Sequence, residues 1–211
     1  DFFEDNDLDH NWKNDFTMID VDRAATSRFT YYGTECPESG GVFAFTIVYE
    51  RPNHNGIAPI SGDAVLMAGT PLSENITGDN WIISQKLKAG EGAQFDFWAR
   101  NLESLQSVLP SAKHKVAVLV SETGNSSTDQ FTEVLPLEEI PFLDRADWKH
   151  YVIDLSAYAG KDIYVAVRDY NATFALQAFY DDFTFTNFVP AEGSNIQGIS
   201  AEDAQNAAVT V

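Results

Sequence analysis

The chain has 211 residues, of which 44% are hydrophobic and 13% aromatic, and this composition excludes an intrinsically disordered protein. Its 32 acidic residues outnumber its 13 basic ones, and the net charge of −19 excludes nucleic acid as an electrostatically favoured partner. With Cys36 as the one cysteine, no internal disulfide can form, and the lack of any apolar stretch of about 20 residues excludes a membrane-spanning helix.

Short strand-forming segments separated by turn-rich segments dominate the chain. The predicted strands are residues 41–49, 63–68, 80–84, 93–100, 115–121, 131–135, 149–155, 162–170 and 177–185. In one of them Phe95 and Phe97 alternate with Gln94 and Asp96, which predicts one buried and one polar face. Trp81 is interpreted as a core residue. Because no apolar pattern with the helical period is sustained, the sequence predicts an all-β sandwich or barrel.

The end of the chain differs in composition from the rest. After Pro190 the aromatic residues stop, and small and polar residues follow. The sequence therefore predicts one domain over residues 1–190 and a C-terminal linker or tail over residues 191–211. Within this tail, residues 207–211 have the composition of an added strand.

Several stretches, taken in order, carry a family resemblance. They are FFED at residues 2–5, DNWIIS at 79–84, VAVLVSETG at 116–124, DLSAYAGKDIYVAVR at 154–168 and FYDDF at 179–183. Together they resemble the cleaved-adhesin family, also called choice-of-anchor J domains. These are adhesin-like modules of secreted and surface proteins in Bacteroidetes, including the adhesin regions attached to gingipain proteases. The resemblance spans about residues 1–190.

The resemblance implies a fold, a location and a role. The fold is a jelly-roll β-sandwich of two antiparallel sheets, galactose-binding-like or MAM-like. The location is extracellular or on the outer cell surface, without membrane insertion. The role is cell adhesion or ligand binding, with calcium as a structural ion and a host or matrix protein or a glycan as the partner. The chain would be a monomer or part of a larger modular protein.

A calcium site is expected where the ends of the domain meet. In jelly-roll modules the first and last strands lie side by side, so a carboxylate from each, with nearby loop oxygens, can supply the oxygen ligands that Ca²⁺ needs. Side chains alternate along a strand, so one of two adjacent aspartates ligates through its side chain. The candidate ligands are Glu4 on the first strand, Asp181 and Asp182 on the last, and Ser61 and Asp63 in a turn before a strand.

Exposed aromatic residues are the expected device for glycan binding, because their rings stack on the apolar faces of sugars. The candidates are Tyr31, Tyr32, Trp98 and Trp148. The first interpretation of the chain is a calcium-stabilised adhesion module. A carbohydrate-binding module on the same fold is the alternative, because fold alone does not select the function.

No residue stands out as catalytic. His10, His54, His114 and His150 lie in no serine-nucleophile or zinc-protease motif. No pair among the 32 acidic residues is distinguished by its spacing. We therefore expect no enzyme, while a glycan-active jelly-roll enzyme stays the third interpretation, which a cleft with two carboxylates about 5–10 Å apart would support.

Overall fold

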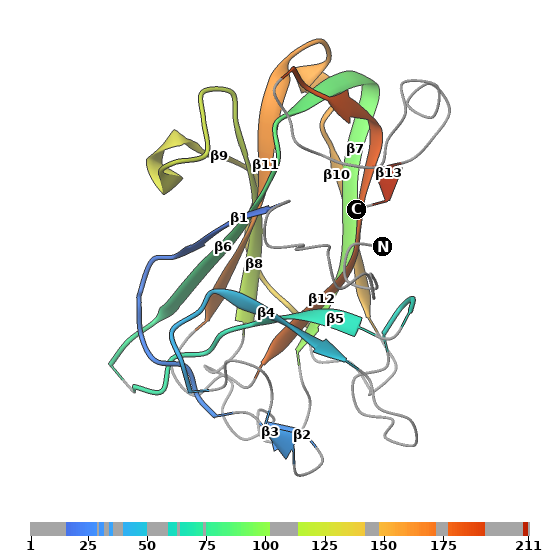
Figure 1. Ribbon diagram of the computed structural model, residues 1–211. Coiled ribbons are helices and arrows are strands. Elements are labelled where there is room, and N and C mark those ends of the chain that lie inside the picture. The colour runs from blue at the N-terminus through green and yellow to red at the C-terminus, as the bar shows by residue number, and fades with distance from the viewer. Residues whose placement is uncertain are drawn as a thin grey trace.

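The computed structural model places most of the domain. It describes residues 16–28, 30–31, 34–35, 40–49, 59–62, 64–73, 75–101, 114–141, 148–171, 177–192 and 209–210. Figure 1 shows strands from two sheets that face each other, with β4 and β5 crossing the lower end in this view. The predicted all-β sandwich is confirmed, and its strand pairs are antiparallel.

The first sheet is ordered β1–β6–β11–β8–β9. Its strands are β1 (Phe16–Asp20), β6 (Gly78–Ser84), β11 (Asp162–Asn171), β8 (His114–Ser121) and β9 (Thr132–Glu139). The second sheet is ordered β10–β7–β12–β5–β4. Its strands are β10 (Lys149–Asp154), β7 (Leu87–Asn101), β12 (Ala178–Pro190), β5 (Ala64–Ala68) and β4 (Phe45–Tyr49).

Three short strands and two single-turn helices complete the described elements. The strands β2 (Thr30–Tyr31) and β3 (Thr34–Glu35) pair with each other, and β13 (Val209–Thr210) pairs with β12. The 3₁₀ turns are η2 (Thr128–Gln130) and η3 (Ser156–Tyr158). In the described part of the chain, no helix has the length and apolar character needed to cross a membrane. The end of the predicted tail thus contributes a strand to the second sheet.

Aromatic side chains fill the space between the sheets. Phe95 and Phe97 on β7 are buried, and the predicted alternation of this strand is confirmed. The ring of Phe97 stacks on Tyr151 of β10 at 4.9 Å, and Phe95 contacts Phe183 of β12 edge to face at 5.5 Å. Such aromatic pairs add stabilisation beyond the apolar area that they bury.

A corner of the sandwich forms where the start of β7 pairs with a strand of each sheet, β11 and β12. Leu87 at the start of β7 pairs with β11 of the first sheet, whereas residues 94–99 pair with β10 of the second. Between Ala89 and Gln94, residues 90–93 of β7 face the single residue Asn187 of β12. Gly92 and Asn187 both have left-handed backbone angles, with φ of 66° and 60°. A bulge of this kind bends the strand, and it creates a hollow beside it.

Trp81 is buried, but it lies outside the main core. Together with Ile83 and Leu119 it forms a cluster on the outer face of the first sheet. Phe131, which precedes β9, reaches across this face and packs against the Trp81 indole at 5.8 Å. The interpretation of Trp81 as a core residue is confirmed, in a smaller core cluster that the β8–β9 connection covers from the outer side.

Candidate functional site

A buried carboxylate lies on the outer face of the second sheet. Asp181 of β12 has no exposed surface. Its Oδ2 accepts a 2.7 Å hydrogen bond from the backbone N–H of Ile60, and its Oδ1 accepts one of 2.9 Å from the N–H of Asp182. The hydroxyl of Ser61 donates a 2.6 Å hydrogen bond to Oδ1 of Asp182. The structure therefore brings Asp181, Asp182 and Ser61 together, across 121 positions of sequence.

The local backbone explains this arrangement. The pairing of β12 with β7 is irregular between Asp181 and Thr184, and Asp182 has a left-handed φ of 48°. The irregularity interrupts the strict alternation of side chains, so both carboxylates can approach the same loop. That only one of the two aspartates ligates an ion through its side chain stays a prediction.

The electrostatics of Asp181 favour a compensating positive charge. Burial raises the pKa of the Asp181 carboxyl from 3.8 to about 7, and hydrogen bonds from the backbone of Ile60, Asp182 and Ser61 oppose the rise. The nearby charge of Asp182 raises it further. A buried anion is costly unless a partner neutralises it. The site thus combines a desolvated carboxylate with a second carboxylate and a hydroxyl.

The side-chain oxygens of Asp181, Asp182 and Ser61 suit a hard cation. Carboxylate and hydroxyl oxygens are ligands that Ca²⁺ accepts, and the shell needs further oxygens from carbonyls or water. Within the described residues, no group of three or more His, Cys, Asp or Glu side chains could hold a metal ion. The predicted ligands Glu4 and Asp63 lie outside the described residues, and their role stays a prediction.

The predicted pairing of the first and last strands concerns the strand around Glu4, which lies outside the described residues, so it stays a prediction. The first described strand, β1, pairs with β6, whereas β12 pairs with β7, β5 and β13. The loop before β5 therefore approaches the two aspartates of β12, and β1 does not. Nothing in this pairing places residues 1–15.

Trp98 lies beside this cluster. It is opposite Asp181 in the β7–β12 pair and opposite His150 in the β7–β10 pair, so the three side chains form one row on the outer face. The His150 ring stacks on the Trp98 indole at 4.3 Å, and its Nε2 lies 2.9 Å from Oδ1 of Asp96. One face of the indole is therefore already covered by an imidazole.

The other predicted ligand-binding aromatics are less accessible or not described. Trp148 is only 8% exposed, and the guanidinium of Arg100 lies over its ring at 4.9 Å. The backbone of Tyr31 lies in β2, but its side chain lies outside the description, as does Tyr32. The ligand-binding role of these residues stays a prediction.

A buried polar network connects the two sheets near one end of the sandwich. Nδ1 of His114 donates to the carboxylate of Asp169 at 2.8 Å, and the hydroxyl of Tyr180 donates to the same carboxylate at 2.5 Å. Nε2 of His114 lies 3.3 Å from the Thr70 hydroxyl. All four side chains are buried, so this network holds the fold together and offers no exposed nucleophile. The polar neighbours Arg168 and Asp169 could have indicated it, since one of two adjacent strand residues must face inward.

A second polar group missed from the sequence lies on the outer face of the first sheet. Two of the three guanidinium nitrogens of Arg168, Nε and Nη2, each donate to the Asp79 carboxylate at 2.7 Å. The guanidinium also lies over the rings of Trp81 and Tyr170, at 5.4 and 4.9 Å. This bidentate pair fixes the neighbouring strands β6 and β11 in register.

The chain is similar in sequence to two hemagglutinins. Hemagglutinin A of Porphyromonas gingivalis is 27% identical over 163 residues, which span 70% of this chain and 6% of that protein. The hemagglutinin A of strain W83 is also 27% identical, over 164 residues, and 7% of its length is covered. The chain thus spans a small fraction of the length of the curated relatives that it matches.

Solved structures confirm the fold. The K1 cleaved adhesin domain of Lys-gingipain from P. gingivalis W83 superposes with a TM-score of 0.57 and 21% identity, covering 87% of this chain and 94% of that domain. A Stig cyclase from Fischerella sp. TAU superposes with a TM-score of 0.51 and 15% identity, covering 90% and 94% of the two chains. Since an adhesin domain and a cyclase share this architecture, the fold alone does not select a function.

The sequence itself carries the family assignment. The model of the cleaved adhesin domain matches residues 39–185, which is more than half of the chain. This range includes the strands of both sheets from β4 to most of β12, together with Asp181, Asp182 and Ser61. The chain therefore belongs to the cleaved adhesin domain family.

Proposed function

We propose that the chain is a non-catalytic binding module of a secreted or cell-surface adhesin, and that Ca²⁺ stabilises it. One observation supports the calcium site. The buried Asp181 lies beside Asp182 and Ser61 on the outer face of the second sheet. A divalent cation would neutralise the two carboxylates and tie the loop before β5 to β12.

The adhesive role is supported by the family. The matched relatives are hemagglutinins, and this chain corresponds to a small part of their length. A module of a larger adhesin fits this relation. The partner would be a host or matrix protein or a glycan, held by loops on a rigid sandwich.

A binding role without catalysis is supported by the placement of the described polar groups. His114 and Asp169, which together resemble part of a catalytic relay, are fully buried and share a hydrogen-bond network with Tyr180. Asp181 lies under the loop that contains Ile60. None of these groups presents a reactive atom to a substrate in solution.

Adhesion measured with and without calcium tests the proposal. The purified chain would be applied to surfaces coated with matrix proteins or with glycans, in Ca²⁺ and in chelator. We expect retention on at least one surface in Ca²⁺, and weaker retention in chelator.

The variant Asp182→Ala should lose the difference between the two conditions, because it removes a ligand without emptying the core. Asp154→Ala, at an exposed carboxylate of β10, is the matched control and should behave like the parent. Retention on no surface in either condition would contradict the binding role.

A further inference from the structure

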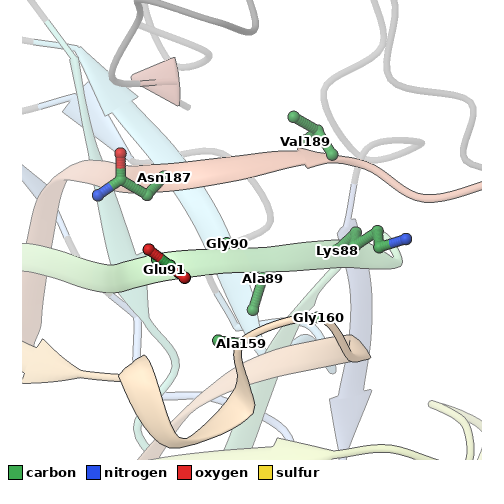
Figure 2. Close-up of a pocket in the computed structure, with 8 residues that line it drawn as sticks. All are labelled: Lys88, Ala89, Gly90, Glu91, Ala159, Gly160, Asn187 and Val189. Carbon is green, nitrogen blue, oxygen red and sulfur yellow. The ribbon is translucent and has the colours of Figure 1, made fainter.

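A hollow lies at the corner of the sandwich, and no residue of the proposed cation site lines it. Its volume is about 500 Å³, and it lies between β7, the turn that follows η3, and β12 (Figure 2). Small residues line it, namely Ala89, Gly90, Ala159 and Gly160. A hollow of this size is in the range of small-molecule sites.

The backbone shapes this hollow. Residues 90–93 of β7 bulge opposite the single residue Asn187, and this opens the space beside the strand. A Cβ at Gly90 would stand 2.9 Å from the carbonyl oxygen of Asn187, so β12 requires glycine there. Two of its three sides, β7 and β12, are strands paired with each other, so the sheet fixes their backbones.

The hollow is lined by one positively charged and one negatively charged side chain. Lys88 and Glu91 project from β7 at separate ends of the hollow, as Figure 2 shows. Asn187 stands on the β12 side, where its Nδ2 donates a 3.1 Å hydrogen bond to the carbonyl of Gly92 and its Oδ1 is an acceptor. The rim thus offers a cationic donor at Lys88 and an anionic acceptor at Glu91, and their charges cancel, in a chain of net charge −19.

We infer that this hollow binds a neutral saccharide unit. Hydroxyl groups both donate and accept, so they can bond to Lys88 and to Glu91 alike, whereas an anion would meet Glu91 and a cation would meet Lys88. The floor of alanine and glycine lets the apolar face of a sugar ring approach the backbone closely. The inference rests on the proposed binding role, but it does not depend on the cation.

A matched pair of variants tests this. Ala159, which directly follows η3, lines the hollow, whereas Ala157 within η3 is exposed and does not line it. Ala159→Leu fills the hollow from an exposed position, and Ala157→Leu adds the same side chain outside it. Saturation-transfer NMR and calorimetric titration would use glucose, galactose, mannose, N-acetylglucosamine and lactose as probes. We expect the parent and Ala157→Leu to bind at least one probe, and Ala159→Leu to bind it at least about tenfold more weakly.

Three results would overturn the inference. They are no saturation transfer from any probe at millimolar concentration, equal binding by the two leucine variants, and binding of free amino acids or dipeptides in place of sugars. Thermal melts of both variants verify folding. If no sugar binds while Ca²⁺ still raises the melting temperature and the chain still adheres to a protein surface, the saccharide site alone is rejected and the proposed function stands.

Discussion

The backbone N–H of Ile60 donates a 2.7 Å hydrogen bond to the buried carboxylate of Asp181, joining the segment before β5 to the middle of β12. Ser61 adds a hydrogen bond to Asp182 from the same segment. These contacts hold both carboxylates against the loop, and the loop buries the carboxylate of Asp181. The titration of Asp181 in the metal-free protein therefore tests whether this carboxyl is buried.

Without metal, stability should fall as the pH rises. The pKa of Asp181 is raised from 3.8 to about 7 in the folded chain, chiefly by burial. Between these values the folded state holds a proton that the unfolded state has released, so this group stabilises the fold at low pH and loses that effect as the pH passes about 7. The size of the effect is at most about 4 kcal/mol.

Urea unfolding in chelator from about pH 4 to about pH 8 would measure this dependence. In Asp181→Asn, which carries no titrating group at this position, the fall should be smaller than in the parent. Parallel pH profiles for the two proteins would show that Asp181 is not buried as described.

The His114 network should be essential to the fold. Replacing His114 with alanine leaves the Asp169 carboxylate buried with one partner fewer, which costs about 3–5 kcal/mol of unfolding free energy. Tyr180→Phe removes the second donor to the same carboxylate, and burial keeps the pKa of Tyr180 well above 10, so that it stays a donor. We expect the two changes to be non-additive in denaturant unfolding, because both act on Asp169. Strict additivity would argue against a shared network.

Arg168→Lys should destabilise the outer face of the first sheet. Lysine cannot make the two parallel hydrogen bonds to Asp79 or stack its head group on Trp81 in the same way, so we expect a loss of about 1–2 kcal/mol. The control is Lys86→Ala, which removes an exposed pair with Asp162 and should cost less than about 1 kcal/mol. Equal losses in chemical unfolding would be the contrary result.

The strands of this chain were predictable because alternation is a local signal. The run from Gln94 to Trp98 already shows which side chains face the core, and the structure confirms it. The pair Asp181–Asp182 and the loop residue Ser61 were also identifiable, since the family resemblance directs attention to the last strand.

Other features depend on register and bulges, which a linear pattern does not contain. The stack of His150 on Trp98 requires β7 and β10 to pair with these two residues opposite each other. The hollow beside Asn187 requires four residues of one strand to face one residue of the other. The cluster that buries Trp81 depends on Phe131, which lies far along the chain, just before β9.

Thermal unfolding in Ca²⁺ and in chelator tests the proposed cation site most directly. A ligand at about 100 times its dissociation constant adds about 2.7 kcal/mol to the stability of the state that binds it. We predict a higher melting temperature in Ca²⁺ than in chelator for the parent and for Asp154→Ala, and no difference for Asp182→Ala. A parent chain that melts at one temperature in both conditions would contradict the proposal that Asp181, Asp182 and Ser61 hold calcium.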